Sequence, residues 1–459
     1  MEKEHIAIVG AGLVGSMQAC YLAQRGYSVS VFERRGDIRK AEIAAGKSIN
    51  LALSDRGWKA LAGIDMEEAV RKISIPMKGR MIHSLEGDVS FQPYSKDGKC
   101  IYSVSRGGLN QLLLERAGEN EGVSLYFNMQ CKDIDLKTNS ITFNDVNSGE
   151  LSTKTFDRIF GTDGAYSAVR LRMQKLDRFD FSQEYLSHGY KELEIPALPN
   201  GKHRMDVNSL HIWPRGEFML IALPNMDGSF TLTLFFPFEG ETSFESIKTK
   251  QDVADFFEKT FPDAIPHMPN LVEDYFANPT ASLVMMKTYP WHHQDKACLM
   301  GDSAHAIVPF YGQGMNSGFE DCTYFEALME EHNADWTKVF EAYSKVRKPA
   351  GDAILELAVR NYIEMRDLTA DPHFVLQKKI EKRFALKFPE KWMPLYEQVT
   401  FSHIPYEEAL ERGDVQNNIM QRVMDRPDIE EAWDSESVEQ AIINEVEALN
   451  LPSPLSLKD

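Results

Sequence analysis

The sequence is poor in cysteine. Its five cysteines, Cys20, Cys100, Cys131, Cys298 and Cys322, are odd in number, lie far apart and include no Cys-x-x-Cys pair. This pattern argues against a disulfide framework and a zinc site, and it predicts a reducing, cytoplasmic location. No His-x-x-x-His or His-Glu-x-x-His spacing occurs, so no metal site is expected.

Long apolar runs and excess positive charge are also missing. No run of 18 apolar residues occurs, and the charged start, MEKEH, leads directly into an apolar segment, so neither a membrane span nor a signal peptide is predicted. The 459 residues carry a net charge of −19, which disfavours nucleic acid as a partner because its phosphates would be repelled. With 43% hydrophobic residues, the chain is expected to be globular, with two or three domains.

The N-terminal segment contains a dinucleotide-binding pattern. Residues 5–9 are expected to form a buried strand, GAGLVG follows from Gly10 to Gly15, and after a helical stretch a second strand ends at Glu33. Gly10 permits a tight turn, Gly12 lets the backbone approach a pyrophosphate, and Gly15 allows close packing of the helix on the strand. The helix N-terminus offers N–H groups to phosphates, and Glu33 can accept a hydrogen bond from a ribose hydroxyl. The pattern leaves open whether the adenosine belongs to FAD or to a nicotinamide cofactor.

Two later motifs favour FAD. In FDRIFGTDGAYSAVR an apolar run ends at Asp163, and in GDSAHAIVPFYGQGMN a strand is followed by Asp302 and by a helix expected to begin near Gly314. A nicotinamide dehydrogenase has no use for this second acid with its distant glycine-rich helix start. In a flavoprotein, Asp302 can bond a ribityl hydroxyl, and the N–H groups at the helix start can face the electron-rich end of the flavin ring.

These three motifs resemble the signatures of the FAD-dependent aromatic hydroxylases. Within that group, longer segments resemble the kynurenine 3-monooxygenase family, and the resemblance spans residues 1 to about 415. The segments are KSINLALSDRG (47–57), PMKGRMIHS (76–84), FQPY (91–94), YSVSRGGLN (102–110), HGYKEL (188–193), LHIWPRGEFMLIALPNMDGSFTLTLF (210–235), RNYIEM (360–365) and PLYEQVTFS (394–402).

The resemblance implies particular site residues. Positions that hold FAD in the family correspond here to Val14, Phe32, Glu33, Arg34, Arg35, Ala52, Arg106, Cys131, Asp302, Met315 and Asn316. Added to Gly10, Gly12, Gly15, Asp163 and Gly314, these positions complete the predicted cofactor site, with Cys131 contributing through its backbone. The family's substrate contacts correspond to Arg80, Tyr94, Asn361 and Tyr396. No catalytic side chain is expected, because the flavin carries the chemistry.

The activity that the resemblance implies is hydroxylation of L-kynurenine to 3-hydroxy-L-kynurenine. NADPH is the expected co-substrate and O2 the oxygen source, within tryptophan catabolism and NAD biosynthesis through quinolinate. Arg80 suits the α-carboxylate because a guanidinium can bind it with two parallel hydrogen bonds. Four residues from distant segments must then meet in one pocket, which is a structural prediction. Tyr311 stands where relatives carry Phe or His.

The predicted fold is α/β: a Rossmann-type FAD-binding domain with a β-sheet substrate domain and a helical C-terminal region. The FAD-binding domain is expected to be discontinuous, over 1–75, 100–175 and 285–350, and the β-rich substrate domain to comprise 76–99 and 178–284. Residues 351–459 are expected to be helical. Mitochondrial relatives end in a hydrophobic membrane anchor, whereas the acidic tail here, from Pro427, predicts a solvated helix and a loose end.

Other interpretations stay open. One is a flavin hydroxylase of another aromatic acid or a phenol, and another is a non-catalytic flavoprotein that binds proteins. A third is an NAD-dependent dehydrogenase, which the N-terminal motif alone would permit. His305 is expected to order its turn rather than to act at the flavin, and His292 and His293 to lie at the surface. A homodimer is among the assemblies that the sequence leaves open.

Overall fold

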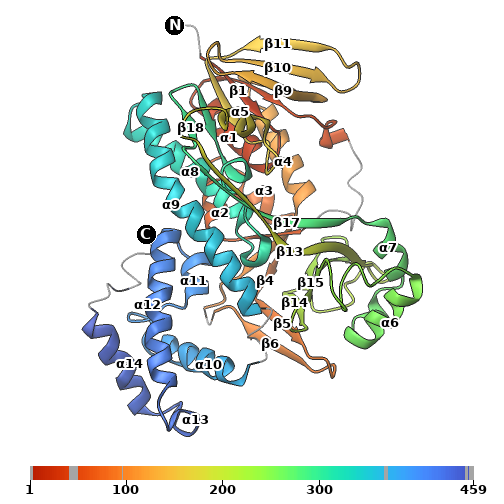
Figure 1. The fold of residues 1–459 in the computed structure, drawn as a ribbon, viewed down its shortest axis with the longest axis vertical. Coiled ribbons are helices and arrows are strands. Elements are labelled where there is room, and N and C mark those ends of the chain that lie inside the picture. The colour runs from red at the N-terminus through yellow and green to blue at the C-terminus, as the bar shows by residue number, and fades with distance from the viewer. Residues whose placement is uncertain (1–3, 41–49, 96, 366–370, 450–452, 454–459) are drawn as a thin grey trace.

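The computed structural model describes residues 4–40, 50–95, 97–365, 371–449 and 453. Figure 1 shows an upper part built around a parallel sheet, a lower part built around a second sheet, and a group of C-terminal helices beside it. Long helix α9 (Trp336–Ile363) runs from the upper part down to the C-terminal helices. This architecture confirms the predicted combination of a Rossmann-type domain, a β-sheet domain and a helical C-terminal region.

The upper part contains a six-stranded sheet in the order β18-β19-β12-β1-β2-β8, which is parallel except for β18. Its strands are β1 (His5–Val9), β2 (Ser28–Phe32), β8 (Val123–Tyr126), β12 (Arg158–Gly161), β18 (His292–His293) and β19 (Ala297–Leu299). Helices α1 (Leu13–Gln24), α4 (Arg106–Gly118) and α8 (Gly314–Glu331) pack together beside it. Because helices cover the sheet, most residues of β1, β2, β12 and β19 are apolar and buried, as is usual for parallel strands.

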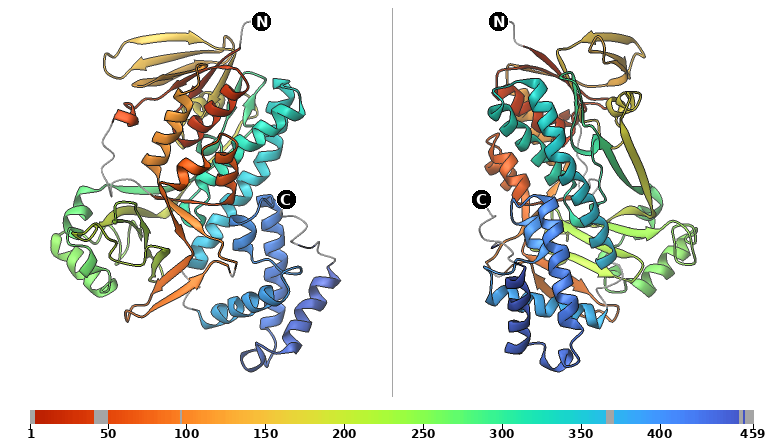
Figure 2. Two further views of the ribbon diagram at one scale, coloured as in Figure 1. Left: turned by 180° about the vertical axis from the view of Figure 1, so that it is seen from behind. Right: turned by 60° about the vertical axis from the view of Figure 1, so that its left-hand side comes forward.

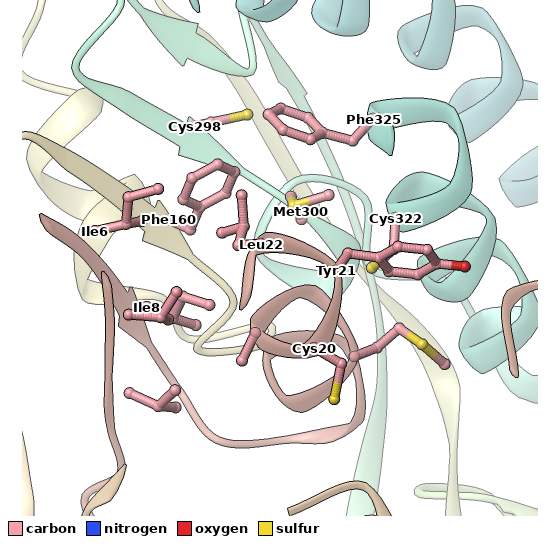
Figure 3. Close-up of a cluster of buried hydrophobic side chains, with 14 of the residues drawn as sticks. Ile6, Ile8, Cys20, Tyr21, Leu22, Phe160, Cys298, Met300, Cys322 and Phe325 are labelled. Atoms are coloured by element: carbon pink, nitrogen blue, oxygen red, sulfur yellow. The ribbon is translucent and has the colours of Figure 1, made fainter. Parts of the chain in front are cut away.

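The core of this part lies between the sheet and its helices (Figure 3). Ile6 and Ile8 of β1 and Leu22 of α1 are buried in it, and Phe160 of β12 meets Phe325 of α8 edge-to-face at 5.3 Å. Three of the five free cysteines lie in the same core: Cys20, Cys298 and Cys322. Burial raises the pKa of the Cys20 thiol to about 12, so this thiol stays protonated and unreactive at neutral pH.

The lower sheet has seven strands in the order β17-β13-β16-β15-β14-β5-β6. Neighbours are antiparallel except for the parallel pair β14 and β5. Most of the sheet comes from β13 (Asp180–Ile195), β14 (Ser209–Pro214), β15 (Met219–Pro224), β16 (Phe230–Pro237) and β17 (Thr280–Tyr289). The remaining strands, β5 (Gly79–His83) and β6 (Val89–Pro93), come from about 100 residues earlier in the chain. The predicted β-sheet of the substrate domain is therefore present, and it is mixed.

The two faces of the seven-stranded sheet have different neighbours. On β15, Leu220 and Ala222 point to a core formed with α6 (Lys250–Thr260) and α7 (Leu271–Ala277). The alternate residues Met219 and Ile221 point instead to a cavity. This alternation follows from the two-residue repeat of a strand, and it makes the sheet both a core element and a wall of the site.

Two smaller sheets and several short helices complete the two parts. One antiparallel sheet contains β9 (Met129–Asp135), β10 (Ser140–Asp145) and β11 (Leu151–Thr155), and another contains β3 (Asn50–Leu53), β4 (Ser74–Met77) and β7 (Ile101–Ser105). The short helices are α2 (Asp55–Ala62), α3 (Glu67–Arg71), α5 (Ala168–Met173), η1 (Ile38–Lys40), η2 (Ile265–His267), η3 (Gly301–Ser303) and η4 (Pro309–Tyr311). The β3–β7–β4 sheet lies where the two larger parts meet, and β3 carries Ala52 of the predicted cofactor site.

The C-terminal region is helical: α10 (Pro372–Lys387), α11 (Leu395–Thr400), α12 (Tyr406–Met424), α13 (Ile429–Ala432) and α14 (Glu436–Ala448). Figure 2 shows these helices gathered beside the lower end of α9, and α12 packs on α9. No helix within the described ranges is long and apolar enough to cross a membrane.

The acidic tail differs from its prediction as a solvated helix. Val438, Ile442 and Val446 recur every four residues on α14 and are buried in a cluster with Ile380 of α10 and Ile419 of α12. The tail's acidic residues concealed this apolar stripe, which is visible only at helical spacing. The predicted loose end, beyond residue 449, falls outside the described residues except for residue 453.

Candidate functional site

The turn from β1 to α1 has the shape that its glycines predict. Gly10 has φ +101°, a conformation that favours glycine. A Cβ at Gly15 would collide with the Gly10 carbonyl oxygen, whereas a Cβ at Gly12 would meet nothing within 4 Å. The turn therefore leaves open space in front of Gly12 at the N-terminus of α1. At the end of β2, the Glu33 carboxylate accepts hydrogen bonds from the backbone N–H groups of Ala11 (3.1 Å) and Arg35 (3.0 Å).

A cavity of about 390 Å³ lies between this turn and the seven-stranded sheet. The turn lies at the carboxyl ends of the parallel strands, where open α/β sheets bind their ligands. Seven predicted cofactor residues line the cavity: Gly12, Val14, Ala52, Arg106, Asp302, Gly314 and Met315. They come from segments up to about 300 residues apart in the sequence, so the fold brings them together across several elements.

Asp302 opens into this cavity from η3, directly after β19. The protein around the cavity desolvates the carboxylate and raises its pKa, and the positive charge of Arg106 partly opposes this effect. Asp302 and Arg106 are both exposed residues, and both line the cavity. Asp302 is thus an acceptor for a hydroxyl-bearing ligand, and its placement agrees with the proposed contact to a ribityl chain.

The start of α8 forms the cavity floor. Gly312 has φ +66° and turns the chain into α8, which begins at Gly314 as expected. The Asn316 amide donates to the Gly312 carbonyl of this turn (2.9 Å). It also ties the turn to the end of β3, accepting from the Ser54 N–H (2.9 Å) and donating to the Ala52 carbonyl (2.8 Å). These contacts fix the helix start, whose free N–H groups favour an electron-rich ligand.

His305 holds the turn rather than lining the cavity. It is buried, and its Nε2 lies 2.6 Å from Asp321, whose carboxylate also accepts the Gly301 N–H at 2.9 Å. Burial by itself would raise the pKa of Asp321, but His305 and Arg347 lower it below its ordinary value. The carboxylate therefore stays charged and anchors the loop that carries Asp302, as the turn-ordering interpretation of His305 expects.

The other predicted cofactor residues do not line the cavity: Gly10, Gly15, Phe32, Glu33, Arg34, Arg35, Cys131, Asp163 and Asn316. The Phe32 ring is buried in a stack with Phe143 at 4.0 Å, so only its backbone is available to a ligand. Asp163 accepts from the Ser167 hydroxyl (2.5 Å) and the Ala168 N–H (2.6 Å), and so caps α5. Their roles at the cofactor stay predictions.

FAD fits the residues that are present. The open space at Gly12, the acceptor at Glu33, the cavity-facing Asp302 and the start of α8 suit a pyrophosphate, a ribose, a polyhydroxylated chain and an electron-rich ring, in that order. These groups occur in one molecule only when a dinucleotide carries a flavin.

A cluster of arginine and tyrosines lies where the cavity meets a second chamber, of about 550 Å³. The Arg80 guanidinium of β5 lies 4.7 Å from the ring centre of Tyr396 and 5.6 Å from that of Tyr94. The two tyrosine rings stack at 5.3 Å, and Tyr311 stacks on Tyr396 at 5.6 Å from the cavity side. Among the described residues, Arg80 forms no salt bridge, and the buried Tyr94 hydroxyl makes no hydrogen bond of normal geometry.

Arg80 remains charged in this setting. Burial would lower its pKa, but the neighbouring Tyr396, Tyr94 and Glu364 groups reverse the effect, and the pKa stands above its ordinary value. A half-buried guanidinium that forms no salt bridge among the described residues gains stability when an anion binds it. The cluster is therefore suited to a ligand carboxylate.

Asn361 completes the set of predicted substrate contacts. It lies on α9, is buried, and its Nδ2 donates to the Phe310 carbonyl at 2.7 Å. All four predicted residues line the second chamber: Arg80, Tyr94, Asn361 and Tyr396. The structure thus brings the four together, although their roles toward a substrate stay predictions.

Comparison with known proteins identifies the family. Residues 3–358 match the family model described as "FAD binding domain". The chain is 52% identical to kynurenine 3-monooxygenase of Flavobacterium johnsoniae, over 95% of this chain and 98% of the relative. Proteins of the same name from Dictyostelium discoideum (48% identical, 91% and 93% covered) and Sus scrofa (45%, 92% and 88%) are also similar. The chain belongs to the kynurenine 3-monooxygenase family.

Solved structures support the fold alone. A tetrameric form of 2-methyl-3-hydroxypyridine-5-carboxylic acid oxygenase has a TM-score of 0.66 at 19% identity, covering 82% of this chain and 96% of the other. The Pseudomonas aeruginosa protein PqsL in complex with 2-aminobenzoylacetate has a TM-score of 0.64 at 17% identity, covering 80% and 97%. The FAD-binding monooxygenase fold is therefore shared across very different sequences.

For this member of the kynurenine 3-monooxygenase family, the apolar wall was partly predictable. Leu210, Met219 and Ile221 of the sheet and Pro309–Phe310 line the cavity, as expected from the strand patterns. Sequence reasoning missed Glu364, which follows Asn361 by three residues and lines the same chamber. The helical spacing from Asn361 was the signal that could have revealed it.

Proposed function

We propose that the chain is an FAD-dependent monooxygenase that hydroxylates L-kynurenine to 3-hydroxy-L-kynurenine, with NADPH and O2 as co-substrates. The observation that carries the proposal is the half-buried Arg80 guanidinium. It lies beside the stacked rings of Tyr94 and Tyr396, lacks a salt bridge among the described residues, and borders the cavity that fits a flavin. The relatives named kynurenine 3-monooxygenase, at 45–52% identity across nearly their whole length, support the same substrate.

Each side chain has a definite task in this proposal. Arg80 binds the substrate carboxylate through its N–H edge while its faces contact tyrosine rings, which fix the plane of the guanidinium. The Tyr94 hydroxyl, which makes no hydrogen bond of normal geometry with the described residues, can donate to the same carboxylate. With the carboxylate held at the chamber wall, the aromatic ring extends along the apolar face formed by Met219, Ile221 and Phe310.

Bound FAD supplies the redox chemistry and the activation of O2, held by the turn at Gly12, by Asp302 and by the start of α8. The substrate's ring amine already enriches its neighbouring carbon with electrons, so no protein base is required to activate that carbon. The chain instead positions the ring and keeps water away, through the buried Phe310 and Tyr311 and the apolar strand residues. This division of labour suits a site with no candidate catalytic base at the cluster.

Two finer points stay predictions. A cytoplasmic location agrees with the five cysteines, all of which are unpaired. A homodimer is a further prediction, which the elution volume of the purified protein, measured with light scattering, would decide.

The decisive experiment follows NADPH oxidation by the purified, FAD-loaded protein in air, with and without L-kynurenine. The expected result is a large rise in NADPH consumption with L-kynurenine, accompanied by 3-hydroxykynurenine. A yellow protein that ignores L-kynurenine but responds to a phenol or another aromatic acid would overturn the substrate. A protein that binds no FAD would overturn the flavin chemistry, and with it every monooxygenase interpretation.

A further inference from the structure

The chamber beside Arg80 carries acceptors as well as a cation. Glu364 and Asn361 both line it, and they lie one helical turn apart at the end of α9, so they share a face of the helix. The Glu364 side chain is 38% exposed, and its charge lies near enough to Arg80 to help stabilise the guanidinium. Two acceptors at the end of α9 and the donor on β5 thus line the same chamber.

The hydrogen-bond partners of these groups define which atoms stay available. Because the Asn361 Nδ2 donates to the Phe310 carbonyl, the amide oxygen is the atom left for the chamber. Within the described chain, the ion-pair partner of Glu364 is Lys378, at a long 3.8 Å, and Lys378 is also 3.3 Å from Glu381. A carboxylate has about four acceptor positions, so one distant lysine leaves most of them open.

We infer that Glu364, together with the Asn361 amide oxygen, binds the α-ammonium group of the substrate while Arg80 binds its carboxylate. This inference rests on the proposed function, and it makes Glu364 a determinant of specificity for an α-amino acid head. The ammonium and the carboxylate of such a head are bonded to the same carbon, and they match a carboxylate and a cation that line one chamber close enough to interact.

The consequence is selection against acids that lack the amine. A site built only from Arg80 and tyrosines would accept any aromatic acid of suitable length. A site that also places the Glu364 carboxylate in the chamber favours the α-amino acid over its des-amino analogue, because only the amino acid offers this carboxylate a charged hydrogen-bond donor. The alternative is that Glu364 only tethers α10 through Lys378, and Glu381 provides a matched control because it contacts the same lysine.

The test measures dissociation constants of the FAD-loaded protein for L-kynurenine and for 4-(2-aminophenyl)-4-oxobutanoate, which differs only in lacking the α-amine. Wild type, Glu364→Gln and Glu381→Gln are compared by calorimetry, with flavin content and circular dichroism as checks of folding. Wild type is expected to prefer L-kynurenine by about tenfold or more. Glu364→Gln is expected to weaken L-kynurenine binding about 10- to 100-fold, with the analogue changed less than about threefold. Glu381→Gln is expected to leave both constants unchanged.

Three outcomes would count against the idea, and they are distinguishable. Equal affinity of wild type for the two ligands would overturn the ammonium site while leaving the proposed function intact, and this comparison needs no variant. An equal loss for both ligands in Glu364→Gln, reproduced by Glu381→Gln, would show that the carboxylate acts only through Lys378. A flavin-loaded wild type that binds neither ligand would overturn the proposed function, and this inference with it.

Discussion

Arg80 depends on its neighbours for its orientation. A free guanidinium on a strand samples many rotamers, but here its faces contact Tyr94 and Tyr396, and those rings stack on each other at 5.3 Å. A planar fork held in this way is preorganised for a carboxylate, which lowers the entropy cost of binding.

Replacing Arg80 by alanine should weaken L-kynurenine binding by about 2–4 kcal/mol, because the substrate carboxylate loses its charged partner in a partly desolvated site. FAD content should not change, since the cofactor residues on the cavity are untouched. Calorimetric titration of the FAD-loaded variant measures the effect, with Lys78→Ala as control because Lys78 is an exposed cation two residues away. Unchanged affinity in Arg80→Ala would remove Arg80 from the substrate site.

Single residues of the site differ in how far the sequence reveals them. Gly10, Gly12 and Gly15 carry their roles in their spacing, because the turn geometry is local. Arg80 and Tyr396 came only from the resemblance, since an arginine in a strand and a tyrosine in a helix are common surface or core residues. Their contact across more than 300 residues of chain depends on packing that no local pattern contains.

At the scale of elements, the turn between β1 and α1 separates two kinds of glycine. A side chain at Gly15 has no room, because its Cβ would collide with the Gly10 carbonyl oxygen. A side chain at Gly12 has room in the protein, since nothing lies within 4 Å, and this space is where a pyrophosphate would lie. Gly15 is thus needed for folding, whereas Gly12 is predicted to make room for the ligand.

Gly12→Ala should therefore leave the melting temperature of the FAD-free protein unchanged while raising the dissociation constant for FAD at least about tenfold. Gly15→Ala should lower that melting temperature by several degrees, which corresponds to about 1–3 kcal/mol for an overpacked contact. Thermal denaturation and flavin fluorescence titration separate the two effects. Normal FAD affinity in Gly12→Ala would refute the assignment of the open space to the cofactor.

The seven-stranded sheet shows which element-scale features are predictable. The alternating sequence of residues 219–235 is typical of β-strands. In the structure, one face of these strands lies in the core with α6 and α7, and the other face lines the cavity. The parallel pairing of β14 with β5 was not predictable, because it joins segments about 130 residues apart and neither carries a local mark of its partner. That pairing is what brings Arg80 to the cavity wall.

Helix α14 offers a test of the corrected tail. Ile442 is fully buried against α10 and α12, whereas the adjacent Ile443 is only partly buried at the edge of the same cluster. Ile442→Ala should lower the free energy of unfolding by about 2–5 kcal/mol, and Ile443→Ala by less than half as much. Urea denaturation of both variants measures the difference. Equal, small effects would mean that the tail is a solvated helix after all.

At the scale of the whole molecule, the site exists only because distant segments meet. Gly12 and Asp302 come from the upper part, Arg80 from the lower sheet and Tyr396 from the C-terminal helices. A buried ionic network joins these parts: Arg56 of α2 pairs with Glu320 of α8 and donates to the Val399 carbonyl at 3.2 Å. The sequence predicted the separate parts well, but it contained no signal for this connection, because each member is an ordinary charged residue of a helix.

The pH dependence of folding should reflect a histidine that the fold keeps neutral. His211 lies on the buried face of β14, where its Nε2 bonds the Asp206 carbonyl at 2.8 Å and its Nδ1 lies 2.9 Å from Nε2 of His83. Burial lowers the pKa of His211 from 6.5 to about 4. As the pH falls from 6.5 to about 4, His211 becomes protonated in the unfolded chain but stays neutral in the folded chain. The contribution of His211 to the free energy of unfolding is therefore complete above pH 6.5, declines on acidification, and changes no further below about pH 4.

This histidine alone should reduce the free energy of unfolding by about 2 kcal/mol between pH 7 and pH 5. His211→Asn should be less stable at pH 7, because it loses buried contacts, but its stability should fall less steeply over the same interval. His373→Asn changes an exposed histidine and should keep the slope of the wild type. Urea denaturation at several pH values, at low protein concentration because the isoelectric point is about 5.2, gives these slopes. If His211→Asn and the wild type have the same slope, another buried group must control acid unfolding, and the carboxylates Glu320 and Asp321 would then be tested next.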